Sequence, residues 1–195
     1  MVIGDILFFR QDHLSVSNVV RNSYELLAQE VEKYPEREFD KQSDHEAVSA
    51  LAIHIMIEPI NLNYDSAIKK AEEITVTRRN EFGDVFETPG LRVTKTFSFS
   101  GDRNLWNIGI GKLSSSMPKG SVGNGTITIG MEVPHNNGKA AADHIISTVE
   151  QIERYLKDQN ETLARFNADL PSRLLPLVQA RRSRRSNAEQ LLGDF

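Results

Sequence analysis

The most regular hydrophobic pattern of the chain lies in its last third, between Ile145 and Leu170. Successive apolar positions there are three, four or seven residues apart, and the longest step passes over Gln159. This spacing is typical of a heptad seam on one long helix, which we expect to begin near Lys139 or Ala140. The seam consists of Ile145, Val149, Ile152, Leu156, Gln159, Leu163, Phe166 and Leu170. Such a stripe must be covered, either by the body of the same chain or by a helix of another molecule.

Beyond the seam the chain contains a proline and then a basic patch. Pro171 predicts an interruption of the long helix, because proline removes one backbone N–H donor, and Asp169 is a suitable cap for a second helix starting there. The basic patch consists of Arg181, Arg182, Arg184 and Arg185. We expect these arginines to be solvated at a helix end. The alternatives are pairing with an acidic surface, such as residues 25–46 of another copy, and contact with nucleic-acid phosphates, which is less favoured because no aromatic residues are interleaved.

The first third of the chain predicts one clear helix and one ambiguous segment. Residues 18–34 carry a broad apolar stripe at helical spacing, and Pro35 ends it. Residues 50–62 alternate in a way that favours a strand, although residues 43–46 could cap a short helix that runs into the same segment.

The next segments predict a short helix followed by strands. Asp65 or Ser66 could cap a helix over residues 67–73, and residues 74–77 are β-branched and favour extended structure. Residues 85–134 contain two period-2 alternations separated by clusters of glycine, proline and asparagine. Closely spaced turns of this kind are typical of an antiparallel sheet or small sandwich.

Together these patterns predict an α+β fold. We expect a small antiparallel β-rich body with one or two N-terminal helices, followed by a long C-terminal helical arm or hairpin. The predicted division places the body in residues 1–138, with its β-rich segment over 85–134, and the helices in residues 139–195.

The composition of the 195-residue chain narrows the function classes. The chain contains no cysteine, which excludes disulfides, thiolate metal sites and cysteine nucleophiles. No stretch approaches the roughly 18 consecutive apolar residues of a membrane span. The start of the chain also lacks the basic region of a signal peptide. We therefore expect a cytoplasmic protein with no membrane partner.

The five histidines form no recognisable metal or catalytic motif. None pairs with another at the four-residue helical spacing that would present two imidazoles to zinc, and we predict no metal, cofactor or catalytic residue. An enzyme remains the rival hypothesis, namely a small hydrolase using His13, His54 or His135 with nearby carboxylates. It requires a concave site in which a histidine meets a carboxylate.

The only tryptophan, Trp106, follows a turn at Gly101 and Asp102. We expect it to anchor the core just after that turn. The alternative is an exposed aromatic side chain on a binding loop, which would fit the neighbouring Arg103.

Two blocks of the sequence resemble a poorly characterised region found upstream of effector domains in multidomain bacterial proteins, some of them linked to anti-phage defence. The first block is Phe97-Ser98-Phe99-Ser100-Gly101-Asp102, Asn104-Leu105-Trp106 and Pro118-Lys119-Gly120. The second is Ile152-Glu153-Arg154-Tyr155-Leu156, Phe166-Asn167, Leu170-Pro171 and Arg181-Arg182. The resemblance implies a scaffold part that precedes an effector of TIR or nuclease type, and it transfers no catalytic residue.

These observations favour a non-enzymatic scaffold, sensor or oligomerisation module over an adaptor for nucleic acid or a hydrolase. Its partner would be a second copy, or a fused or separate domain. The predicted helix interface consists of Val149, Ile152, Leu156, Gln159, Leu163 and Phe166, with Gln159 setting the register. In that case, aspartate at Leu156 and Leu163 should dissociate the assembly and leave the monomer folded.

Overall fold

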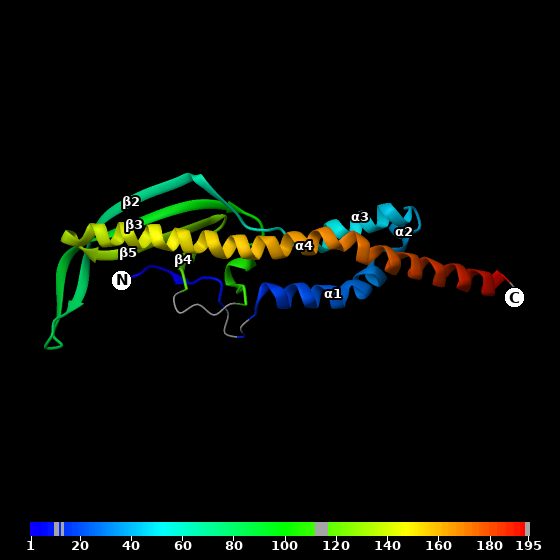
Figure 1. Ribbon diagram of the computed structural model, residues 1–195, viewed down its shortest axis with the longest axis horizontal. Helices are drawn as coiled ribbons and strands as arrows, with labels where there is room; N and C mark the ends of the chain where they lie inside the picture. Colours follow the sequence, from blue (N-terminus) through cyan, green and yellow to red (C-terminus); the bar gives the residue numbers. More distant parts are fainter. Residues whose placement is uncertain (10–11, 13, 112–116, 194–195) are drawn as a thin grey trace. The chain divides into compact units, whose positions relative to one another are not determined.

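The computed structural model describes residues 1–9, 12, 14–111 and 117–193, and the chain has the predicted α+β fold (Figure 1). In chain order the elements are β1 (Asp5–Ile6), α1 (Val16–Lys33), α2 (Glu36–Phe39), α3 (Asp44–Ile55), β2 (Asn61–Arg79), β3 (Val85–Ser100), η1 (Arg103–Asn107), β4 (Lys119–Val122), β5 (Thr126–Pro134), η2 (His135–Asn137) and α4 (Gly138–Gly193).

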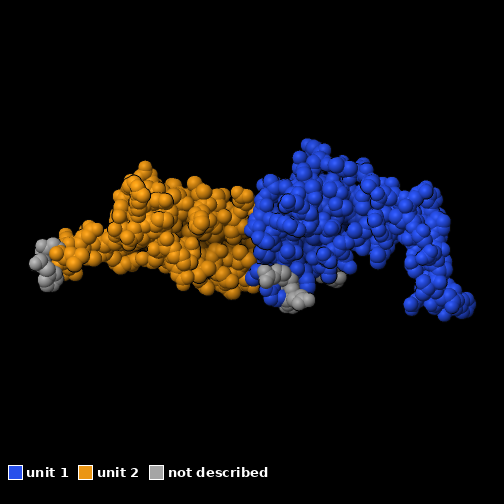
Figure 2. Space-filling model, turned by 180° about the vertical axis from the view of Figure 1, so that it is seen from behind, with its two compact units in different colours: residues 1–15, 59–160 blue, residues 16–58, 161–195 orange. Residues whose placement is uncertain are grey.

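The chain divides into two compact units, coloured separately in Figure 2. Unit 1 contains Met1–Ser15 and Pro59–Asn160, and unit 2 contains Val16–Glu58 and Glu161–Phe195. This division differs from the predicted break at residue 138, because neither the sheet nor the N-terminal helices form a separate body. Each of them packs with its own half of α4.

Unit 1 is built on a five-stranded antiparallel sheet with the order β1-β4-β5-β3-β2. The β3–β5 register places Phe97 opposite Ile127, on the face that also carries Val133. These three side chains are buried, as are Ile152 and Leu156 in the first half of α4, which runs along the sheet (Figure 1). The apolar alternation of β3 and β5 and the first half of the seam therefore form the core of unit 1.

Unit 2 packs α1, α2 and α3 around the second half of α4. Its buried core consists of Leu27, Val31, Phe39, Ala47, Val48, Leu51, Phe166, Leu170, Leu174 and Val178. Helix α1 confirms the helix predicted for residues 18–34, and the core uses the i, i+4 pair Leu27 and Val31.

The strand interpretation of residues 50–62 is wrong over its first half, where α3 continues to Ile55. The start of α3 is a capping box, in which the Ser43 hydroxyl accepts from Glu46 N at 3.3 Å and the Glu46 carboxylate accepts from Ser43 N at 2.7 Å. Val48 and Leu51 are buried, whereas Ile53 is 72% exposed. The local alternation is overridden because helical spacing, not period 2, brings the buried side chains onto one face.

The short helix expected over residues 67–73 is also wrong, because this segment belongs to β2. The strand pairs with β3 from Ile68 opposite Thr96 to Arg79 opposite Val85. Its helix-forming lysine, alanine and glutamate residues are extended because long-range pairing outweighs a weak local preference. Residues 74–77 are extended, as predicted.

Helix α4 continues through both of its prolines, so the interruption and second cap predicted at Pro171 are absent. Pro171 and Pro176 are both exposed, while Leu170, Leu174 and Val178 stay buried. The prolines lie away from the core, where water can reach the carbonyl groups that lose an N–H partner.

Candidate functional site

The predicted helix interface is buried inside the single chain. Val149, Ile152 and Leu156 are buried in unit 1, and Leu163 and Phe166 are buried in the part of α4 that belongs to unit 2, with exposed fractions between 0 and 9%. The seam is therefore covered by the chain's own body. These side chains are not available to a helix of another molecule, and the predicted helix interface is corrected to internal core.

Gln159 occupies its seam position for a local reason. Its side chain is fully buried, and Nε2 donates to Leu105 O at 3.1 Å and to Ile108 O at 2.9 Å. These carbonyl groups lie in η1 and just after it, where no neighbouring strand donates a hydrogen bond to them. Gln159 thus fixes the η1 turn within unit 1 and does not set the register of an oligomer.

Trp106 is a core residue, and the binding-loop alternative is wrong for it. Its ring is fully buried and lies 5.5 Å from the Phe8 ring and 5.4 Å from the Phe99 ring, measured between centroids. Arg103, at the start of η1, is exposed and donates from Nη2 to Val122 O at 2.9 Å. The two residues share a turn, but only the arginine reaches the surface.

The arginines of the basic patch contact other residues of unit 2 in the same chain. Arg181 is 5% exposed, and its Nη1 donates to Val31 O at 2.5 Å and to Tyr34 O at 2.9 Å. Its guanidinium lies over the Phe39 ring, 4.3 Å from the centroid. Arg181 therefore satisfies the carbonyl groups at the end of α1, as a C-terminal cap supplied by another helix.

The other three arginines pair with acidic residues of the same unit. Arg182 Nε lies 2.6 Å from Asp44 Oδ1, Arg185 makes two hydrogen bonds to the Asp40 carboxylate at 2.6 and 3.1 Å, and Arg184 pairs with Glu32. The expected acidic surface is thus residues 32–44 of the same chain and not of another copy. The predicted solvated helix end is likewise corrected to a network of intramolecular pairs.

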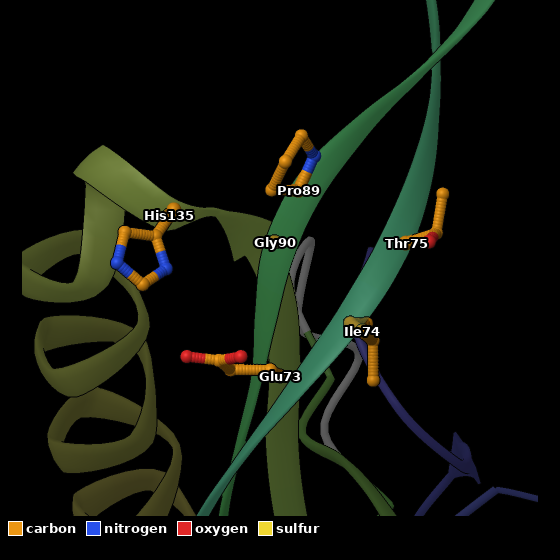
Figure 3. A pocket seen from close by; sticks show the side chains of 6 residues that line it. All are labelled: Glu73, Ile74, Thr75, Pro89, Gly90 and His135. Carbon is orange, nitrogen blue, oxygen red and sulfur yellow. The ribbon is translucent and has the colours of Figure 1, made fainter.

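A cavity of about 560 Å³ brings together the histidine and carboxylate that the enzyme hypothesis requires. It is lined by Glu73, Ile74, Thr75, Pro89, Gly90 and His135. Figure 3 shows the Glu73 carboxylate and the His135 ring on the same side of the β3 ribbon. Both side chains are exposed, and within the described part of the chain no group of His, Asp and Glu could hold a metal ion.

Of the described histidines, His135 is the one that lines this cavity. His54 is exposed on α3 in unit 2, and His13 lies outside the described residues. His144 is partly buried on α4, and burial is the main cause that lowers its pKa. Its Nε2 lies 3.5 Å from the hydroxyl of the buried Thr148 one helical turn further on, and neither residue lines this cavity.

The β2–β3 hairpin is the surface that the sequence analysis missed. At its tip the Asn80 carboxamide oxygen accepts from Phe82 N at 3.0 Å and from Asp84 N at 2.8 Å, and Gly83 has a φ of 91°. The turn leaves Phe82 89% exposed and Val85 60% exposed. Figures 1 and 2 show the hairpin projecting from the rest of unit 1. The turn residues 80–84 are the sequence signal for this hairpin, and the helix predicted over residues 67–73 conflicts with it.

Strand β2 also carries a row of charges along the edge of the sheet. It is the last strand in the sheet order, and β3 is its hydrogen-bonded neighbour. Lys70 pairs with Glu72 at 2.5 Å, which holds the pKa of the Glu72 carboxyl below its usual value. The register places Glu72 opposite Arg92 of β3, and Arg92 pairs with Glu132 of β5 at 2.7 Å.

Comparison with protein-family models, with curated proteins and with solved structures finds no match to this chain. Among the described helices, none combines the length and apolar character that crossing a membrane requires.

Proposed function

We propose that the chain is a non-enzymatic oligomerisation scaffold and that unit 1 carries its assembly surface. The observation that carries the proposal is the β2–β3 hairpin, which leaves a long hydrogen-bonding edge and several large apolar side chains uncovered in the single chain. Ile68 on β2 is 68% exposed, and Phe82 at the tip is 89% exposed. Exposed strand edges of this kind are templates for pairing with another chain.

The rival functions have weaker support. Phosphate binding by the basic patch would require Arg182, Arg184 and Arg185 to give up the carboxylate pairs that they form within unit 2. Glu73 and His135 share a cavity, but a hydrolase also needs a nucleophile and a group that orients the histidine. The β2 edge needs less rearrangement, since the exposed Lys70–Glu72 pair has only to be shared with a second copy.

The wider setting is proposed from the resemblance. We infer that the scaffold is the N-terminal part of a larger bacterial protein of the defence type, acting in the cytoplasm. In such a protein the assembly of the scaffold would bring effector domains together. The cysteine-free sequence is compatible with this compartment.

The proposal is tested by light scattering of the 21.9 kDa chain over a range of concentrations. We expect a mass above that of one chain, rising with concentration. Replacing Phe82 and Val85 by serine should weaken the assembly by removing exposed apolar surface from the hairpin. The matched control replaces Leu191 and Leu192, which are 63% and 76% exposed at the end of α4, by serine. A monomer at every concentration would overturn the proposal.

A further inference from the structure

We propose that two copies of the chain pair through their β2 strands, antiparallel to each other, about a two-fold axis at Ala71. This inference rests on the proposed scaffold function and specifies its partner, its surface and its register. The segment concerned is Ile68-Lys69-Lys70-Ala71-Glu72-Glu73-Ile74. Read in opposite directions from Ala71, it has the same pattern of apolar and charged positions with the sign of every charge reversed.

A two-fold axis at Ala71 matches each charged residue with its opposite. Lys69 faces Glu73 of the second copy, and Lys70 faces Glu72 of the second copy, so the symmetry gives four attractive pairs. Ile68 then lies opposite Ile74 of the second copy. Directly opposite residues in an antiparallel pair are close neighbours on the same face, where opposite charges attract and like charges repel.

The surroundings of the strand fit this register. The β2–β3 pairing is regular from Ile68 to Arg79, and its one irregularity lies before Ile68, so the whole segment keeps an uninterrupted antiparallel register. Ile68 to Ala71 are exposed in the single chain, and Ile68 is 68% exposed. Pairing would cover this isoleucine with another one.

Charges on the existing sheet continue the same alternation. The register places Glu72, Arg92 and Glu132 side by side on β2, β3 and β5. Lys70 of the second copy would extend this row beyond Glu72. The charges would then read lysine, glutamate, arginine, glutamate across four neighbouring strands, each beside its opposite.

Charged residues on an edge strand more often protect it from pairing with another chain. The order of the charges distinguishes such a protective strand from one whose charges favour pairing in a single register. A protective block of like charges would repel a second copy in every register. Here, moving the axis by one residue, to Lys70 or to Glu72, places two lysines or two glutamates directly opposite each other. Parallel pairing in register does the same at all four positions. Only the axis at Ala71 matches all four charges, so the pattern specifies one register.

The test is a charge-exchange series measured by sedimentation equilibrium and light scattering. We expect K69E/K70E and E72K/E73K each to weaken self-association on the order of 100-fold, because four attractive pairs become repulsive. The fourfold variant K69E/K70E/E72K/E73K restores the reversed pattern between the copies and should recover most of the association, less the repulsion between the lysine that E72K introduces and Arg92 of β3. Mixing the two double variants should give a heterodimer. K139E/K157E is the matched control, since it changes the charge equally at two exposed positions of α4.

The outcomes separate this inference from the proposed function. If the wild type associates and the double variants associate equally well, the β2 register is wrong and the scaffold function stands. If the fourfold variant fails to recover association while its circular dichroism matches the wild type, the charge pattern is not what holds the copies together. If the wild type is a monomer at every concentration, both proposals fail.

Discussion

The two halves of helix α4 build their units with different chemistry. In unit 1 the helix uses polar side chains in the interior, where Gln159 holds two carbonyl groups of the η1 region and Asn160 Nδ2 donates to Ile60 O at 2.8 Å. In unit 2 the core side of the helix is apolar from Phe166 to Val178, the part-buried Asn167 pairs with both backbone groups of Ile57, and the Arg181 guanidinium caps the end of α1. A single heptad seam thus packs against an irregular turn in unit 1 and against a cluster of helices in unit 2.

The difference reflects what each half must cover. The η1 turn presents backbone carbonyl groups that no strand pairs with, so a polar residue is needed in the seam. Helices α1 to α3 satisfy their own backbone except at their ends, so the seam facing them can be apolar and α4 supplies polar side chains at those ends. Arg181 donates to carbonyl groups at the end of α1, Arg182 donates to Phe39 O at the end of α2, and Asn167 pairs with Ile57 just after α3. A buried polar residue in a seam is therefore informative about the backbone opposite it.

The strongest test of this division places aspartate in each half of the seam. L156D should disrupt unit 1 and L163D unit 2, because each buries a carboxylate without a partner; we expect losses of about 4 kcal/mol or more. Hydrogen exchange by mass spectrometry should show the protection lost mainly in the unit that carries the change. R165D is exposed on α4 and should leave both units protected. A folded, monomeric L163D variant would show that the seam is not core.

We expect the second largest loss of stability for substitution of Arg181, whose guanidinium caps the end of α1. R181M should destabilise the chain by about 3 kcal/mol, since it removes a buried donor and leaves the Val31 and Tyr34 carbonyl groups without it. R184M removes only a solvent-exposed pair with Glu32 and should cost about 0–1 kcal/mol. Denaturant unfolding compares the two variants. Equal losses would contradict a specific closing role for Arg181.

The corresponding polar residue of unit 1 should have a smaller effect. Q159L keeps the size of the side chain but removes a buried hydrogen bond from the Leu105 carbonyl group, which still accepts from Ile108 N, and from the Ile108 carbonyl group; we expect this to cost about 2 kcal/mol. Trp106 is the only tryptophan and is buried in the same turn, so its fluorescence reports this change directly. The exposed Q179L serves as control. An unchanged emission spectrum and midpoint would argue against the proposed role of Gln159.

A pH effect on unit 1 completes the series. Burial, with a contribution from Glu153, raises the pKa of Tyr64 to about 12, compared with about 10 in an unfolded chain. Between these values the unfolded state loses the proton that the folded state keeps, so stability falls as pH rises through this window. The Y64F variant should lose less stability than the wild type over the same window. Parallel stability curves for the two proteins would contradict the assignment.

The sequence was most informative where a local rule and the core agreed. The spacing of the seam predicted buried positions on one long helix, and the Ser43 and Glu46 pair marked the start of α3. It misled where the two disagreed. Residues 67–73 have good helix formers and become a strand because β3 pairs with them, and Pro171 stays inside a helix because its ring lies on the exposed side.

The functional surfaces were harder to predict because they depend on what lies opposite. Spacing alone indicated that the seam would be covered, but it could not distinguish a second molecule from the chain's own sheet. The four arginines likewise suggest a free patch, although Asp44 pairs with Arg182 and Asp40 pairs with Arg185 across more than 130 intervening residues. The reversed charge pattern around Ala71 is visible in the sequence. It indicates a pairing surface only once β2 is known to lie at an edge of the sheet.

The contact between Arg181 and the end of α1 affects the order in which the two units can fold during synthesis. The contact joins residues 150 positions apart, and the core of unit 2 combines Leu27 and Val31 with residues from Phe166 to Val178. During synthesis the first helices therefore leave the ribosome long before their partners exist, while the β2–β3 hairpin pairs between near neighbours. We expect the apolar residues of α1 to α3 to stay exposed until α4 has been synthesised. Unit 2 should therefore depend more on chaperones than unit 1.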